Sequence, residues 1–113
     1  MILATLRMAI PAQRRGEVLK TIKSMSWEAR IQPGCLSSRL YHDEDKKSVF
    51  MVEAVWSNQD HLDRYLRSED YRRMLLVMEM ADEPPEIKFQ TISNEAGLEV
   101  VEKARGCKRD EEA

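Results

Sequence analysis

The segment at residues 52–75, VEAVWSNQDHLDRYLRSEDYRRML, changes its hydrophobic period partway along and so separates two kinds of secondary structure. Its first five residues continue an apolar run, which predicts the end of a strand. We expect Ser57 to cap a short helix that reaches about Leu66, and Ser68 to cap a second helix. The segment therefore predicts a strand that is followed by two short helices.

Apolar residues after Ser68 recur at intervals of three and four, as they do along one face of a helix. A second apolar side accompanies this stripe, so we expect the helix to be buried around much of its circumference. The stripe consists of Tyr71, Met74, Leu75 and Met78, and the second side consists of Leu76, Val77 and Met80.

Hydrophobic patterns on either side of this segment predict the remaining elements. Residues 2–10 alternate with a period of two and carry apolar side chains on both faces, which predicts a strand that is covered on both sides. The apolar stripe of residues 12–30 predicts a helix that stops at Pro33-Gly34. We further predict a hairpin of strands 35–42 and 48–56, a strand over 87–93 and a final helix over 94–105.

The resulting order, β-α-β-β-α-α-β, is typical of a ferredoxin-like α+β fold, in which helices cover one face of a four-stranded antiparallel sheet. Strands 2–10 and 48–56 also carry apolar residues on their second face. We therefore predict a homodimer in which two sheets face each other across a two-fold axis. Residues 1–94 should form one domain and residues 95–113 a C-terminal helix and polar tail. The sequence leaves open whether that helix packs on its own subunit or on the partner.

Trp27 lies off the apolar stripe of the first predicted helix, on nearly the opposite side. Large aromatic side chains are seldom left exposed without a use. We therefore expect a partner subunit or the C-terminal tail to cover this indole.

Composition excludes several classes of function. Charged residues make up 34% of the chain but leave a net charge of only −2, so no electrostatic footprint for nucleic acid or for an anionic membrane is present. No apolar run approaches the roughly 20 residues of a membrane span. Cys35 and Cys107 match neither a disulfide framework nor a zinc motif, which is typical of reduced thiols in a cytoplasmic protein. His42 and His61 are the only histidines, so we expect no metal site, and we expect both rings to be exposed.

Several short motifs in this chain resemble the antibiotic biosynthesis monooxygenase family, which belongs to the dimeric α+β barrel superfamily. The resemblance spans roughly residues 1–93. The motifs are Pro33-Gly34-Cys35 at the start of a strand, a strand that closes on Trp56, and the run Ser57, His61-Leu62, Tyr65-Leu66, Ser68-Glu69 and Tyr71.

This resemblance implies a cavity between the sheet and the helices of each subunit. Some members of the family oxidise polycyclic phenols or quinols with molecular oxygen and use no flavin, metal or haem, so we expect no cofactor. The deprotonated substrate itself reduces oxygen, while the protein supplies shape, desolvation and a base or hydrogen-bond donor. A small apolar or aromatic molecule is the ligand that such a cavity implies.

The resemblance also suggests candidate site residues. Trp56 and Tyr65 are the predicted lining of a catalytic site, and Arg39 is predicted to steady an anion there. Trp56 could equally be a core residue, and Arg39 could pair with Glu53 across the hairpin. The predicted substrate-binding residues are Met51, Leu62, Tyr71, Met74 and Met78.

Some family residues are missing from this chain. Quinol-oxidising members often carry histidines at the positions of Tyr65 and Asp70, and haem-degrading members carry a haem-ligating histidine at the position of Leu75. Their absence argues against haem breakdown. It also leaves a second hypothesis open, namely a non-catalytic dimeric barrel that binds a small apolar ligand or acts as an interaction protein.

Overall fold

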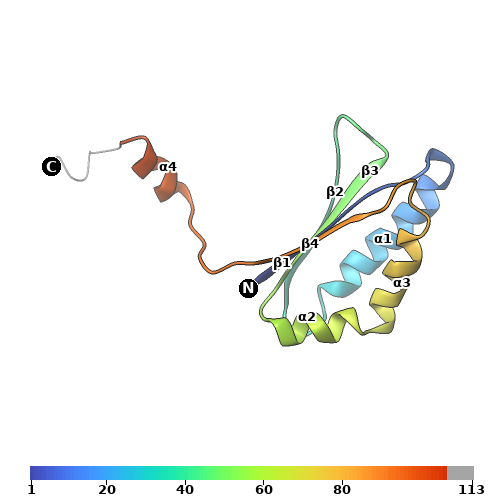
Figure 1. Cartoon of the computed structure of the whole chain (residues 1–113), viewed down its shortest axis with the longest axis horizontal. Helices are drawn as coiled ribbons and strands as arrows, with labels where there is room; N and C mark the ends of the chain where they lie inside the picture. The colour runs from blue at the N-terminus through green and yellow to red at the C-terminus, as the bar shows by residue number, and fades with distance from the viewer. Residues whose placement is uncertain (107–113) are drawn as a thin grey trace.

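The computed structural model describes residues 1–106 of the 113-residue chain. Helices α1, α2 and α3 cover one face of a four-stranded sheet, while α4 stands apart from both (Figure 1). The elements are β1 (Ile2–Ala9), a 3-10 turn η1 (Ala12–Arg14), α1 (Arg15–Ala29), β2 (Cys35–His42), β3 (Val49–Trp56), α2 (Gln59–Leu66), α3 (Glu69–Met78), β4 (Glu86–Thr91) and α4 (Leu98–Ala104).

The strands lie in the order β2-β3-β1-β4, and each neighbouring pair is antiparallel. The predicted ferredoxin-like α+β fold is therefore confirmed. The register places Ile2 opposite both Trp56 of β3 and Thr91 of β4, and it places Cys35 of β2 opposite Trp56. The end of β4 and the start of β2 consequently lie at the same level, on opposite edges of the sheet.

Residue parity along the central strands decides which side chains meet the helices. Even-numbered residues of β1 and β3 face the helices and form the core, because successive side chains of a strand point to opposite faces. One cluster is centred on Leu6, Met8, Ile22, Phe50 and Met74, and a second consists of Ile2, Ala54, Trp56 and Leu62. The opposite face holds half-buried Leu3, Met51 and Val55, and no helix covers it (Figure 1).

The N-cap of α2 is Asn58, whose Oδ1 accepts the N–H of His61 at 2.9 Å. The prediction of Ser57 was wrong by one residue. The N–H of Ser57 donates to the carbonyl of Gly34 at 2.8 Å, a bond between the chain end of β3 and the loop before β2. The predicted cap of α3 is confirmed, since Ser68 Oγ accepts the N–H of Tyr71 at 3.1 Å.

Helix α3 is buried on one side only, which contradicts the expected burial around much of its circumference. Met74, Val77 and Met78 are buried, whereas Leu75 and Leu76 are 47% and 52% exposed. Helices α1 and α2 and the sheet lie against its buried side, and its second apolar side has no neighbour within residues 1–106. None of the helices in residues 1–106 has the length and hydrophobicity needed to cross a membrane.

The predicted hairpin of β2 and β3 turns at Asp43. Asp43 Oδ1 accepts the N–H groups of Asp45 and Lys46 at 2.8 and 3.1 Å. An aspartate that bonds its own backbone in this way stabilises a tight turn. These bonds are also the main reason why the pKa of Asp43 lies below its usual value.

Gly34 holds the loop before β2 against helix α2. Its φ is +83°, and a Cβ at this position would overlap the ring of His61. His61 is therefore partly buried, with its Nδ1 enclosed and unpaired, rather than exposed as expected. His42 is exposed, as expected.

We expect Gly34→Ala to lower the free energy of unfolding by about 1–3 kcal/mol, because a side chain disfavours this φ and collides with His61. In a His61→Ala background the collision is removed and only the backbone cost remains, so the same substitution should cost less. Urea denaturation of the four chains measures both effects. Equal losses in the two backgrounds would show that the packing of His61 on Gly34 contributes nothing.

Candidate functional site

A cavity of about 50 Å³ lies between the sheet and the helices, where the resemblance implied one. Its walls come from β1, β3 and all three packed helices, and Ile87 and Phe89 of β4 form its edge. These two side chains are 42% and 47% exposed, so the cavity opens along the β4 edge. Among residues 1–106, those that line it include no aspartate, glutamate, histidine, lysine or arginine. The cavity is thus apolar apart from a few hydroxyl groups.

Three aromatic rings form one wall of this cavity. The ring of Tyr65 stacks on that of Trp56, with centroids 4.8 Å apart and an angle of 28°. Tyr71 meets Tyr65 edge to face, at 5.5 Å and 70°. Both arrangements are favourable for aromatic pairs. Trp56 is only 1% exposed and anchors the row from the end of β3.

Burial raises the pKa of Tyr65 to about 12, and the nearby Tyr71 and Asp70 add smaller effects in the same direction. Burial also raises the pKa of Tyr71. Both phenols therefore keep their protons at neutral pH. They can donate hydrogen bonds to a ligand, but neither can serve as a general base there.

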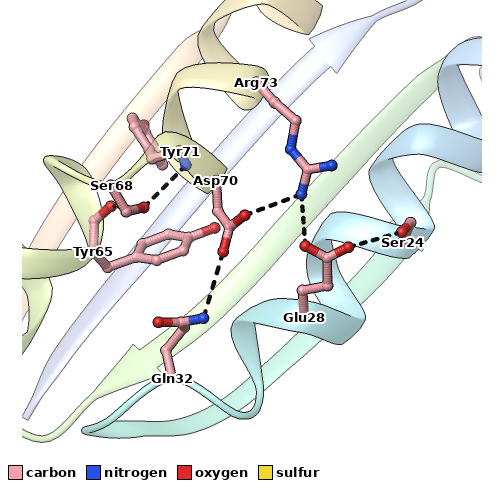
Figure 2. Close-up of polar contacts among 8 residues, drawn as sticks. All are labelled: Ser24, Glu28, Gln32, Tyr65, Ser68, Asp70, Tyr71 and Arg73. Atoms are coloured by element: carbon pink, nitrogen blue, oxygen red, sulfur yellow. Dashed lines mark hydrogen bonds and ion pairs between the residues drawn. The ribbon is translucent and has the colours of Figure 1, made fainter.

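A polar network on the outer side of this wall connects α1 with α3 (Figure 2). Arg73 Nη2 donates to Glu28 Oε2 at 2.6 Å and to Asp70 Oδ1 at 3.1 Å. Gln32 Nε2 donates to Asp70 Oδ2 at 3.4 Å. Figure 2 shows the phenol of Tyr65 pointing towards Asp70. The network therefore places the Asp70 carboxylate close to Tyr65, and it joins α1 to α3.

A pair of buried serines supplies further polar groups to the cavity. Ser26 of α1 and Ser38 of β2 lie with their Oγ atoms 2.9 Å apart and are 5% and 1% exposed. Their mutual bond uses one hydroxyl hydrogen, which leaves the other free to meet a ligand. Neither serine was predicted from the sequence as a site residue. The signal was Ser26 beside Met25 in the apolar stripe of α1, where a polar residue demands a partner.

The structure brings together five of the eight predicted site residues. Met78 lies in the adjoining core and does not line the cavity. Arg39 and Met51 lie on the opposite face of the sheet, because they are neighbours of inward-facing Ser38 and Val52. The five that line the cavity are Trp56, Leu62, Tyr65, Tyr71 and Met74.

Arg39 lies opposite Glu53 in the β2–β3 register. The ion pairs within residues 1–106 nevertheless do not join these two side chains, whereas Arg7 pairs with Asp43 at 3.6 Å. In the same described range, no three histidine, cysteine, aspartate or glutamate side chains gather closely enough to hold a metal ion.

Comparison with known families supports the fold. The family described as antibiotic biosynthesis monooxygenase matches residues 1–75, which is more than half of the chain. The chain belongs to the antibiotic biosynthesis monooxygenase family. A search of curated proteins found no significant match to this chain.

Solved structures share the fold of this antibiotic biosynthesis monooxygenase family member. A crystal structure described as an antibiotic biosynthesis monooxygenase is 18% identical, with a TM-score of 0.75, over 83% of this chain and 100% of that one. A Mycobacterium tuberculosis protein is 20% identical, with a TM-score of 0.76, over 85% and 98% of the two chains. A conserved Methanosarcina mazei protein is 20% identical, with a TM-score of 0.73, over 79% and 89%.

The raised pKa of Tyr65 predicts how stability depends on alkaline pH. Below about pH 10 the Tyr65 phenol is protonated in both the folded and the unfolded chain, so its titration does not change the free energy of unfolding. Between about pH 10 and about 12 the unfolded chain releases this proton while the folded chain retains it, so the free energy of unfolding should fall by the order of 2 kcal/mol. Tyr65→Phe should remove this part of the fall. A pH profile of Tyr65→Phe identical to that of the wild type would contradict the assignment.

Proposed function

We propose that this protein is a cofactor-independent monooxygenase that oxidises an aromatic phenol or quinol with molecular oxygen. The observation that carries the proposal is the apolar cavity with the Trp56–Tyr65–Tyr71 row on one wall. Membership of the antibiotic biosynthesis monooxygenase family supports the reaction class.

Each part of the cavity has a role in this reaction. An aromatic substrate packs against the ring row. The protonated Tyr65 hydroxyl, which points towards Asp70 in the free protein, must turn to donate to the substrate oxyanion. The Ser26–Ser38 pair can hold a second oxygen of the substrate. Because the lining lacks a base, the substrate must enter as its anion or lose its proton to water at the β4 edge.

The phenol itself supplies the electrons in this scheme. A phenol becomes a quinone when it loses the hydrogen of its O–H and that of the para C–H and gains one oxygen atom at that carbon. The second atom of O₂ leaves as water with those two hydrogens. Desolvation in the cavity favours this step, because an anion that is stripped of water gives up electrons more readily.

The size of the cavity limits how a substrate can bind. Ligand pockets usually measure about 300–1000 Å³, several times the about 50 Å³ found here. Binding must therefore widen the space, and flexible Met74 together with half-exposed Phe89 lies where this can happen. The small cavity without a base favours the second candidate function, a module that binds a small apolar ligand without reaction.

Oxygen uptake separates the two functions. We expect uptake above the buffer blank with a panel of hydroquinones and polycyclic phenols in metal-free buffer. Tyr65→Phe should lower the rate about tenfold or more, because one donor to the developing anion is lost. Tyr41→Phe removes a phenol from the opposite face and is the matched control. Arg39→Ala in the same assay should leave the rate unchanged, because Arg39 lies on the opposite face of the sheet.

No uptake with any substrate, and no effect of Tyr65→Phe on ligand affinity, would overturn the catalytic proposal. Quenching of Trp56 fluorescence by the same compounds in a Trp27→Phe background, without uptake, would favour the binding module. Haem titration should give no Soret shift, in keeping with the absent histidine at Leu75.

We further propose that two copies associate through the uncovered face of the sheet. The half-buried apolar side chains of that face, Leu3, Met51 and Val55, support this arrangement. Met51 then belongs to the interface rather than to the cavity. The proposed division of the chain remains residues 1–94 for the domain and residues 95–113 for the C-terminal helix and tail.

Sedimentation equilibrium should show a dimer at micromolar concentration. Val55→Arg places a charge in the proposed interface and should shift the equilibrium towards monomer. Leu75→Arg changes an exposed leucine on α3 and should leave the dimer intact. Circular dichroism checks that both variants fold. If the wild-type protein sediments as a monomer, the proposed dimer is refuted, whereas the proposed chemistry is not affected.

A further inference from the structure

The C-terminal arm, residues 94–105, does not pack against the sheet or the other helices of its own protomer (Figure 1). Helix α4 stands away from the sheet and from the other helices, and Leu98, Val100 and Val101 are 70%, 53% and 52% exposed (Figure 1). The radius of gyration is 17.7 Å, whereas a compact chain of this length has about 13 Å. Isolated helices shorter than about 12 residues are marginal in water. The seven-residue α4 therefore needs a surface to pack against.

A surface that combines exposed apolar side chains with basic and hydroxyl groups lies at the opposite edge of the molecule. Trp27, which is 67% exposed, flanks a hollow between α1 and the edge strand β2. Leu36, which is 56% exposed, flanks an adjoining hollow on β2. We call this surface the Trp27 groove, and its lining includes Lys23, Trp27, Arg30, Leu36 and Leu40.

The charges of the arm and of the groove are complementary. Lys23 and Arg30 give the groove a positive charge, and the Arg30 guanidinium lies 4.9 Å from the centre of the Trp27 ring. The arm reads NEAGLEVVEKAR, so its three glutamates outnumber one lysine and one arginine, and Glu95 and Glu99 lie next to its exposed apolar residues. Opposite charges around an apolar contact fix its register and orientation.

The sheet register indicates which copy supplies the arm. The arm leaves β4 just after Thr91, at the level of Cys35 in β2, but from the other edge of the sheet. If two sheets face each other across an axis that runs along the strands, β4 of one copy lies over β2 of the other. The axis preserves the level along the strands. The arm then departs beside the Leu36 end of the partner's β2.

We propose that in the homodimer the C-terminal arm of each copy docks in the Trp27 groove of the other. The inference rests on the proposed homodimer and is independent of the proposed chemistry. In this arrangement the arm of the partner covers the exposed indole of Trp27, for which the sequence predicted a cover by a partner subunit or by the C-terminal tail.

Docking would also complete the candidate site. Ser26 lines both the cavity and the hollow beside Trp27, and Ser38 lines both the cavity and the hollow beside Leu36. The hydroxyl pair therefore separates the cavity from the groove. A docked arm covers the outer side of the Ser26–Ser38 pair. The C-terminal arm of one copy therefore closes the cavity of the other copy on that side.

Acrylamide quenching of tryptophan fluorescence tests the docking in the full chain. With the arm docked, both Trp27 and buried Trp56 should resist quenching. Leu98→Asp/Val101→Asp should release the arm and make Trp27 accessible, so the quenchable part of the emission should rise to about one half, because Trp27 is one of two tryptophans.

Leu75→Asp/Leu76→Asp is the matched control, since it places two carboxylates on an exposed apolar helix face elsewhere. This variant should leave the quenching unchanged. If quenching is equal in the wild type, the arm variant and this control while the protein sediments as a dimer, the docking is refuted and the dimer stands.

Mixed dimers show whether the arm crosses between copies. One copy carries Leu98→Asp/Val101→Asp and an intact Trp27, and the other carries Trp27→Phe and an intact arm. After exchange of subunits, protection of Trp27 should return, because the intact arm belongs to the other copy. Protection that never returns would show that each arm covers its own chain, which overturns the proposal. A wild-type monomer in sedimentation would also overturn it, whereas the oxygen-uptake result would not.

Discussion

The pairing of β1 with β3 is the constraint on which the other parts of the structure depend. Ile2 lies opposite Trp56, and from that register every even-numbered side chain of the two strands faces the helices. A slip by one residue would turn the whole set to the other face of the sheet. The core, the cavity wall at Ala54 and Trp56, and the position of α2 immediately after β3 all follow from this single pairing.

The cavity combines packing with only a few polar groups. Trp56, Tyr65 and Tyr71 stabilise one another as a row of rings, and the same row presents hydroxyl groups whose protons stay in place at neutral pH. The charges that influence Tyr65 lie outside the cavity, in the network around Asp70 and Arg73. This separation keeps the interior apolar, which suits an aromatic ligand, and leaves the acid–base chemistry to the substrate.

The aromatic part of the site was predictable from the sequence, whereas its polar part was not. Tyr71 and Met74 follow from the period of α3, and Trp56 follows from the end of an apolar strand. Ser26 and Ser38 are twelve residues apart and meet only because α1 packs across β2, a contact that no local pattern reports. Arg39 and Met51 were assigned to the cavity by resemblance, although strand parity turns both of them to the other face.

Local periodicity by itself determined the order of the elements, the cap at Ser68 and the buried stripe of α1, because these depend on neighbours within a few residues. Only the structure shows that Asn58 rather than Ser57 caps α2, while the N–H of Ser57 bonds to the carbonyl of distant Gly34. It likewise decided that His61 is enclosed and that one side of α3 remains open. The physical reason is the same in each case: burial depends on which distant surfaces meet, and hydrophobic period records only that a side chain could be buried.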